Sequence, residues 1–408
     1  MVGYYGLFFF VVVLGYSFRH GYFDPVRLAV FSIILVGSFM VIVSSFYDRF
    51  YMRWSNRSID VKRFLHKLNG FVITVCFVAL YYNLFPEYGS QFYKPYFAFI
   101  NANIYYLIIG SVLYLLVCDY FLGELDSYYY VSMFLFRRCQ FYVVKCHLLS
   151  VLLRCFFTPL MFVYYVNDLS VLGDYYRSFS FGRDFDYYFN LLFHFFYTVD
   201  VFYGVVGYLF CLRLFGLHIR AVYSSLFSWV VAIICYQPFW TMIGKSYLSY
   251  GVPGHSWGTY FLGGTLMHYV WGVLILICVL GYSWSTVVYG CSFSNLTYRR
   301  IMTAGPYRYF LHPSYFFKCA SYWLISVPFF SPSLFDGLRC SFLLFLVCFI
   351  YYLRAKSEES FLLRVSPEYV SYYRSESYFN FYGLRCYRGR MPVSSTALGA
   401  PGQDVRTA

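Results

Sequence analysis

Long apolar stretches, separated by short polar clusters, are the feature of this 408-residue sequence that most constrains its fold. A helix needs about 20 apolar residues to cross the hydrocarbon core of a bilayer, and surfaces of that kind are not left in contact with water. Such stretches fall at roughly 4–16, 28–46, 69–85, 96–117, 147–166, 187–210, 221–239, 259–289, 315–330 and 339–353. The sequence therefore predicts an all-α fold, a polytopic transmembrane helical bundle with about ten spans.

The composition argues against a soluble protein and against a nucleic-acid-binding protein. Hydrophobic residues make up 60% of the chain and charged residues only 12%, whereas a soluble domain carries about 25% charged residues. The net charge of +13 fits basic loops that face anionic lipid headgroups. The 13 cysteines include no CxxC pair and no Cys/His ligand spacing, so we expect neither a disulfide framework nor a metal site.

The distribution of basic residues favours a cytoplasmic location for both termini, because cytoplasmic loops carry an excess of Lys and Arg. With the N-terminus inside, the inner loops would contain Arg49, Arg53, Arg57, Lys62, Arg63, Lys67, Arg137, Arg138, Lys145, Arg213, Arg220, Arg299, Arg300 and Arg308. The outer loops would contain only Arg19, Arg27, Lys94, Arg177, Arg183 and Lys245. We therefore expect an integral, multi-pass protein of an endomembrane, a mitochondrial membrane or a bacterial inner membrane.

The predicted spans divide into two parts, and a polar tail follows them. Residues 1–258 are expected to form an N-terminal transmembrane bundle, residues 259–383 a second membrane core, and residues 384–408 a disordered tail. The last two apolar stretches are joined by Ser331, Pro332 and Ser333, which predicts a C-terminal helical hairpin. The charged, amphipathic segment from Arg354 to Arg374 is expected to form a short helix on the cytosolic side.

Polar residues gather at the ends of the last two apolar stretches, where a membrane normally excludes them unless they have a function. The first group is Gly305-Pro306-Tyr307-Arg308-Tyr309-Phe310-Leu311-His312-Pro313-Ser314-Tyr315, and the second is Arg354-Ala355-Lys356-Ser357-Glu358-Glu359, followed by Pro367-Glu368-Tyr369. A hairpin would bring His312 and Glu358 to the same membrane face. Taken singly, His312 could be a helix cap, and Arg354 with Glu358 an ion pair on one helix face. The order and spacing of the whole set favour a functional site.

This combination of groups suits a zwitterionic amino-acid cofactor. Glu358 would pair with the ammonium group, while Arg side chains or backbone N–H groups near 299–302 would bind the carboxylate. The rings of Tyr307, Tyr309 and Tyr315 would accept an adenine or a sulfonium group. Arg354 lies one helical turn before Glu358 and would hold a substrate carboxylate. Because the sequence has no GxGxxG motif, S-adenosylmethionine would bind between helix ends and not on a Rossmann sheet.

The pattern G-x-Y-x-x-x-x-H-P-x-Y, a hydrophobic hairpin, R-x-x-x-E-E and x-E-Y-x-x-Y resembles the C-terminal core of the isoprenylcysteine carboxyl methyltransferase family. The resemblance is strongest over 295–373. Upstream, the segments 293–297 and 236–239 are similar to a bacterial-type branch of longer, many-span members. Two positions depart from the pattern, since Leu311 stands where many members have Arg, and Phe317 where many have Gly.

The resemblance implies which residues would bind the methyl donor and the substrate. The implied contacts of S-adenosylmethionine are Arg299, Arg300, Ile301, Met302, Tyr307, His312, Pro313, Ser314, Tyr315 and Glu358. Arg354 is implied to contact the substrate. Arg354, Glu358 and His312 are then the expected catalytic residues.

The predicted function is that of a membrane-embedded S-adenosylmethionine-dependent methyltransferase that O-methylates a carboxylate of a prenylated or lipidic acceptor. A carboxylate is already ionised at neutral pH and needs orientation more than a general base. Two alternatives stay open: N-methylation of a phospholipid amine, and a catalytically silent relative that acts as a subunit of a membrane protein complex or as a transporter. The partners expected are the acceptor in the bilayer and membrane lipids.

Four polar residues lie inside the predicted spans and fit more than one of these functions. They are Arg154, His194, Asp200 and His268. Such residues fix helix packing, line a substrate cavity or form a transport path. Helix packing is the interpretation we favour, and a transport path the one we favour least.

Overall fold

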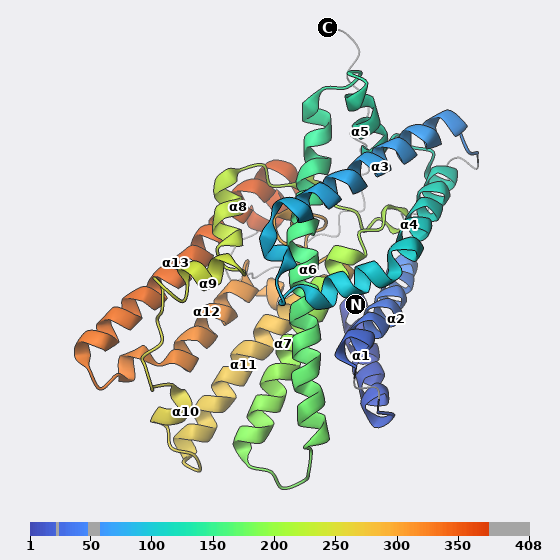
Figure 1. The fold of residues 1–408 in the computed structure, drawn as a ribbon. Helices are drawn as coiled ribbons and strands as arrows, with labels where there is room; N and C mark the ends of the chain where they lie inside the picture. Colours follow the sequence, from blue (N-terminus) through green and yellow to red (C-terminus); the bar gives the residue numbers. More distant parts are fainter. Residues whose placement is uncertain (22–23, 48–57, 375–408) are drawn as a thin grey trace.

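The computed structural model describes residues 1–21, 24–47 and 58–374 and consists almost entirely of helices (Figure 1). The helices are α1 (Val2–Arg19), α2 (Pro25–Tyr47), α3 (Val61–Leu84), α4 (Lys94–Leu122), α5 (Ser127–Leu135), α6 (Phe141–Arg177), α7 (Phe185–Leu209), α8 (Leu226–Ile233), α9 (Phe239–Ile243), α10 (Trp257–Tyr260), α11 (Leu266–Tyr289), α12 (Pro313–Ser326), α13 (Leu334–Val365) and α14 (Pro367–Arg374). Short 3-10 turns are η1 (Pro86–Gly89), η2 (Arg213–Phe215), η3 (Gly290–Ser292), η4 (Gly305–Arg308) and η5 (Pro328–Phe330). Strands β1 (Ala221–Val222) and β2 (Thr297–Tyr298) form one antiparallel pair. The predicted helical class is thus confirmed for the described residues.

Eight helices of the described residues are long and apolar enough to cross a membrane, in agreement with a multi-pass membrane protein. They are α1, α2, α3, α4, α6, α7, α11 and α13. Two of the predicted stretches form shorter elements instead. The stretch at 221–239 is divided between β1, α8 and the start of α9, and the stretch at 315–330 lies in α12 and η5. With 14 residues, α12 is about 21 Å long, which is short of the hydrocarbon core of about 30 Å.

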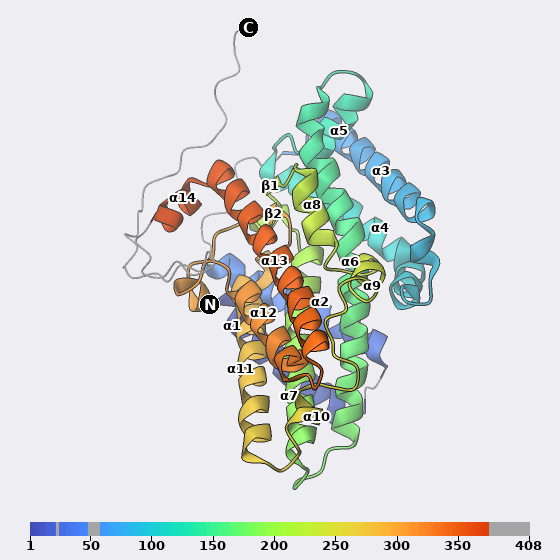
Figure 2. The ribbon, with the colours of Figure 1, turned by 90° about the vertical axis from the view of Figure 1, so that its left-hand side faces the viewer.

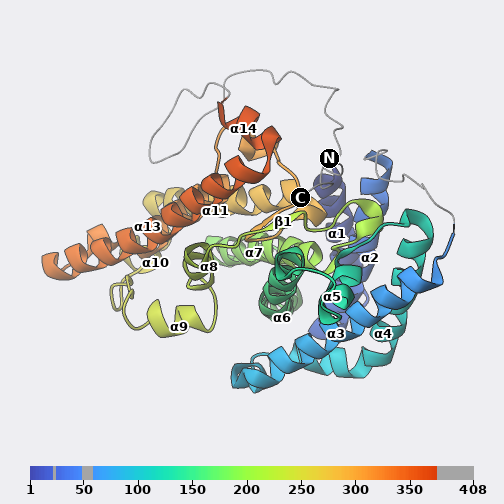
Figure 3. The same ribbon diagram turned by 90° about the horizontal axis from the view of Figure 1, so that it is seen from above.

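Helix α6 is the central element of the bundle, and it packs against α2, α3, α4, α5 and α7. Its apolar residues cover all faces, as expected for a helix that is surrounded by other helices, and Phe157, Leu160 and Tyr165 are fully buried. Phe10 of α1 and Phe202 of α7 complete this core. Seen from above, α3, α4 and α5 lie on one side of α6, while α8 and α10–α13 lie on the other (Figure 3).

Four basic residues that were expected in inner loops lie instead within helices, one of them, Lys145, in α6. Lys62, Arg63 and Lys67 belong to the first turns of α3. Arg63 Nε is 2.7 Å from Asp119 Oδ1, and Lys67 Nζ is 2.8 Å from the same oxygen. Because the Asp119 side chain is fully buried, it needs these cations for its own stability. Arg49, Arg53, Arg57 and the predicted tail 384–408 lie outside the described residues.

The charged segment from Arg354 to Arg374 does not form the separate helix that the sequence predicts. Its first part, up to Val365, belongs to α13. The chain continues as one helix to Val365, and only α14 is separate (Figure 2). Pro367 causes the break between α13 and α14, because a proline disfavours helical geometry in the residue before it. Ser366 has φ −130° and ψ 106°, which is extended backbone.

The boundary expected between residues 258 and 259 falls inside α10. Helix α11, assigned by the sequence to the second part, packs against α7 and α1 of the first part. Val287 and Cys291 belong to the same buried cluster as Phe10 and Val206. The two parts therefore share one core in the structure.

A glycine in α7 allows the segment that follows α11 to approach this core closely. A Cβ atom added at Gly207 would lie 2.0 Å from the carbonyl oxygen of Phe293. Since the backbone would have to move, we expect Gly207→Ala to lower the free energy of unfolding by about 1–3 kcal/mol. Gly110→Ala in α4 is a matched control, because a Cβ there meets nothing within 4 Å. Thermal unfolding in detergent measures both variants, and equal midpoints would contradict the contact.

Candidate functional site

The irregular segments that follow α7 and α11 are held together by the short β1–β2 pair. Ala221 lies opposite Tyr298 in the register. The ladder is extended by hydrogen bonds from Arg220 N to Tyr298 O at 3.0 Å and from Tyr223 N to Leu296 O at 3.0 Å. Buried backbone groups outside helices need such partners, because an unpaired N–H or C=O group is costly. This pairing fixes one wall of a cavity.

Arg299, which directly follows β2, anchors this wall to the end of α7. Its guanidinium donates to the carbonyl oxygens of Gly207 at 2.8 Å and Cys291 at 2.9 Å, and also to that of Leu217. Since the protein itself engages this buried guanidinium, Arg299 has a structural role. Arg299 is therefore not free to bind a ligand carboxylate, contrary to what the sequence suggests. Other groups of the segment 299–302 would have to do so.

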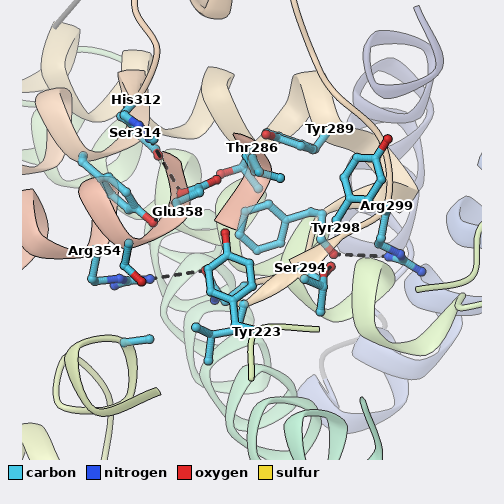
Figure 4. A pocket seen from close by; sticks show the side chains of 18 of the residues that line it. Tyr223, Thr286, Tyr289, Ser294, Tyr298, Arg299, His312, Ser314, Arg354 and Glu358 are labelled. Carbon is cyan, nitrogen blue, oxygen red and sulfur yellow. Dashed lines mark hydrogen bonds and ion pairs between the residues drawn. The ribbon is translucent and has the colours of Figure 1, made fainter. Parts of the chain in front are cut away.

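The opposite wall is formed by the N-terminus of α12 and the C-terminal half of α13 (Figure 4). His312 is the residue before α12 and lies between two carboxylates of α13. Its Nε2 atom is 3.2 Å from Glu359 Oε1, and its Nδ1 atom is 3.7 Å from Glu358 Oε2. Lys356 Nζ donates to the other oxygen of Glu359 at 2.8 Å. The predicted meeting of His312 with Glu358 is therefore present, and Glu359, whose role the sequence did not reveal, fixes the imidazole.

Glu358 borders the cavity and has no basic partner other than His312 among the described residues. The phenol of Tyr315 donates to Glu358 Oε2 at 3.2 Å. The ring of Tyr315 stacks on His312 with centroids 5.6 Å apart. The Glu358 side chain remains 28% exposed, so its carboxylate is available to a ligand cation.

Arg354 is a buried cation without a carboxylate partner among the described residues. Its only hydrogen bond there is a long one, 3.4 Å from Nη2 to Asn295 Oδ1. Its guanidinium carbon lies 5.1 Å from the ring centre of Tyr315, 5.5 Å from that of Tyr351 and 5.6 Å from that of Tyr236. Although Arg354 and Glu358 are one helical turn apart, they form no ion pair in the described part of the chain. The simple helix-face ion pair is thus not what this structure contains.

Most of the residues expected to bind the donor do line this cavity. They are Arg299, Arg300, Ile301, Tyr307, His312, Ser314, Tyr315 and Glu358, and Arg354 lines it as well. Met302 and Pro313 are not part of the lining. Pro313 is buried at the first position of α12, where a proline stabilises the start of a helix.

Tyrosine is the most frequent residue in the lining of this cavity, which the motifs alone do not predict. Eight tyrosines of the described chain line the cavity, namely Tyr223, Tyr236, Tyr282, Tyr289, Tyr298, Tyr307, Tyr315 and Tyr351. On α11, Tyr282, Thr286 and Tyr289 follow the i, i+4, i+7 spacing of one helix face. This spacing indicates a polar face of one helix. With 49 tyrosines in the whole chain, however, such a spacing does not stand out in the sequence.

The phenols of Tyr223 and Tyr307, which lie outside the long apolar helices, remain neutral at physiological pH. Burial raises the pKa of Tyr307 well above its ordinary value, and the neighbouring Tyr289 adds to this effect. Burial and the negative charge of Glu358 raise the pKa of Tyr223 in the same way. Neither phenol is therefore suited to accept a proton as a general base.

The two positions that depart from the family pattern are accommodated in different ways. Phe317 is not among the cavity-lining residues. It lies against Gly281 of α11, where an added Cβ would come within 2.8 Å of its ring, so the missing side chain at Gly281 makes room for the phenylalanine. Leu311 lines the cavity and packs with Tyr298 and Leu362.

A second cavity of about 450 Å³ adjoins the first and lies between α12 and α13. The two cavities share His312, Tyr315 and Tyr351. Its remaining lining is largely apolar and includes Phe316, Cys319, Ala320, Trp323, Phe345 and Cys348. The polar site thus continues into a space suited to hydrocarbon.

Of the four polar residues inside the predicted spans, three are engaged in packing between helices. His268 Nε2 is 2.6 Å from Asp186 Oδ1, and its Nδ1 atom is 2.8 Å from the carbonyl oxygen of Phe261. Asp200 of α7 accepts a hydrogen bond from Thr286 of α11. His194 packs against the ring of Tyr175. No cluster of three potential metal ligands occurs among the described residues.

An unpaired cation that serves a ligand should contribute little to folding. We expect Arg354→Met to unfold within about 1 kcal/mol of the wild type, because it leaves no carboxylate unpaired. Arg63→Met should lower the free energy of unfolding by about 3 kcal/mol, since Arg63 holds both oxygens of Asp119 at 2.7 and 2.9 Å. Denaturation in detergent distinguishes the two, and similar losses would show that Arg354 is structural.

No family model, curated protein or solved structure matches this chain. The link to isoprenylcysteine carboxyl methyltransferases therefore depends on the motifs quoted above. A function has to be inferred from the groups that the cavity brings together.

Proposed function

We propose that the chain is a membrane-embedded, S-adenosylmethionine-dependent methyltransferase that methylates a carboxylate of a prenylated or lipidic acceptor. The observation that carries this proposal is the pair formed by Arg354 and Glu358. One turn of α13 presents a cation and an anion to the same cavity, and neither neutralises the other. Opposite charges that line one cavity without pairing suit ligands that carry complementary charges.

The donor fits the polar cavity through three kinds of contact. Glu358 would pair with the donor's ammonium group, and backbone N–H groups of the segment 299–302 would bind its carboxylate. The tyrosine faces suit a sulfonium by cation–π interaction and an adenine by stacking. The open space is about 100 Å³, whereas ligand pockets usually offer about 300–1,000 Å³. Binding therefore requires some of the tyrosine side chains to turn aside.

The acceptor fits the boundary between the two cavities. Arg354 would hold its carboxylate at the polar end, since an arginine binds a carboxylate through two parallel hydrogen bonds. The apolar cavity between α12 and α13 would take the attached prenyl or acyl chain. An acceptor dissolved in the bilayer would reach this space laterally, without passing through water.

The chemistry asked of the protein is modest. The bound donor supplies an electrophilic methyl group, and an ionised carboxylate needs no proton removed before it reacts. The residues have to orient the two ligands and exclude water. The neutral Tyr223 and Tyr307 provide a low-polarity wall without offering a base.

We also propose the orientation and the arrangement of the helices that this function requires. Both termini would be cytoplasmic, so that the water-soluble donor reaches the end of α13 from the cytoplasm. Helices α12 and α13, which pack against each other and are joined through η5, would form the C-terminal hairpin. With the stretch around α8 included, the count of membrane-embedded segments would approach the ten that the sequence predicts.

Methyl transfer to a farnesylated, N-acetylated cysteine tests the proposal. Wild-type protein should incorporate base-labile methyl groups, as expected for an ester. Glu358→Gln should weaken donor binding about tenfold or more, the effect of losing one charge-assisted hydrogen bond. Arg354→Gln should raise the KM for the acceptor and leave donor binding within about twofold. Glu87→Gln, at an exposed acid of η1 outside the site, is the matched control and should behave like the wild type.

The same assay separates the alternatives. Base-stable label in phosphatidylethanolamine would instead indicate an amine N-methyltransferase. Protein of verified fold that binds no methyl donor would identify a silent relative or a transporter. Unchanged donor affinity in Glu358→Gln would contradict the assignment of this site.

A further inference from the structure

A third cavity, of about 600 Å³, lies on the side of α6 that faces away from the proposed methyl-transfer site. It is bordered by α3, α4, α5 and α6 and by the loop after α7, and it shares no lining residue with the two cavities described above. Figure 3 shows α3–α5 grouped together on this side of the bundle. Nothing in the proposed chemistry uses this space.

Arg154 of α6 is the unusual residue of this third cavity. It lies inside a long apolar helix, where ionisable residues generally mark a functional site. Its only hydrogen bond among the described residues runs from Nε to the carbonyl oxygen of Ser150 in its own helix, at 3.2 Å. No carboxylate of the described chain pairs with it. The remaining donors of its guanidinium are therefore available to a ligand.

The other charged residues around the third cavity neutralise one another. Arg213 pairs with Glu124 at 2.8 Å. Lys67 pairs with both Asp126 and Asp119, and Arg63 pairs with Asp119. The charge of Arg154 is therefore left over, and a ligand with one negative charge would balance it.

A buried histidine adds a second unsatisfied polar group. His218 Nδ1 is buried and has no hydrogen-bond partner among the described residues. Burial, together with the positive charges of the neighbouring Arg213, Arg220 and Arg299, lowers the pKa of His218 to about 4. The imidazole is therefore neutral at physiological pH and adds no charge to the cavity.

The lining of the third cavity mixes polar and apolar side chains, and its apolar part lies on α3 and α4. Phe71 of α3 and Leu107 and Leu115 of α4 line it. Little of α3 or α4 is buried inside the protein, and Leu107 is 39% exposed. A hydrocarbon chain would lie along these residues while its polar end reached Arg154.

We propose that the third cavity binds an anionic glycerophospholipid, with its phosphodiester at Arg154 and its acyl chains along α3 and α4. A phosphodiester carries the single negative charge that the surroundings lack, and its oxygens suit the fork of a guanidinium. The apolar faces of α3 and α4, which are little buried inside the protein, favour a lipid headgroup over free phosphate as the source of the anion. The site is independent of methyl transfer, and its failure would leave that function untouched.

Lipid-dependent thermal unfolding of the delipidated, detergent-purified chain tests this site. Dioleoyl-phosphatidylglycerol should raise the unfolding midpoint of the wild type, while dioleoyl-phosphatidylcholine should have a much smaller effect and sodium phosphate none. In Arg154→Gln the half-maximal phosphatidylglycerol concentration should rise about tenfold or more. Arg339→Gln is the matched control, because Arg339 is a half-exposed arginine of α13 that pairs with Asp336 at 3.4 Å.

A second variant keeps the test decisive if Arg154→Gln does not fold. Gly110 of α4 lines the third cavity, and a side chain added there meets open space. Gly110→Phe should therefore fill the cavity, leave the fold intact and abolish the response to phosphatidylglycerol. The proposal is overturned if both lipids stabilise equally, if phosphate alone reproduces the shift, or if Gly110→Phe responds like the wild type.

Discussion

The capture of backbone carbonyl groups by Arg299 is the interaction on which the rest of the site depends. Buried backbone carbonyl groups need hydrogen-bond partners, and the irregular segments after α7 and α11 have no helix to supply them. Arg299 satisfies carbonyl oxygens of Gly207, Leu217 and Cys291 at once. It thereby joins three stretches of chain that are distant in sequence, and the β1–β2 pair continues the same connection. Without this anchor, the wall opposite α13 would have no fixed position.

Once that wall is fixed, the charges on α13 acquire different roles according to their surroundings. Glu359 and Lys356 hold His312 in place. Arg354 and Glu358 face the cavity without satisfying each other. Keeping such charges unpaired lowers the stability of the empty protein, a pattern common at sites that bind charged ligands. The same reasoning applies to Arg154 on the far side of α6, where the ligand is a lipid and not a substrate.

The sequence predicts the helical class and the proximity of His312 to Glu358, because both depend on local pattern. Apolar stretches locate the eight long helices, and the motif spacing brings His312 to Glu358. The sequence also indicates where α13 ends, because Pro367 is the first residue after Gly337 that can break the helix. The structural role of Arg299 was not readable, because its acceptors belong to residues far away in the chain. Nor does spacing reveal that Arg354 and Glu358 stay apart, since i,i+4 charges of opposite sign normally pair.

The central claim, that Glu358 binds the ammonium group of a methyl donor, is tested most directly by a calorimetric cycle. Wild-type protein and Glu358→Gln are each titrated with S-adenosylmethionine and with an analogue that lacks the α-amino group. The account predicts that the analogue binds the wild type about tenfold more weakly than the parent does, and that the two ligands bind Glu358→Gln equally. Equal binding of both ligands to the wild type would contradict it.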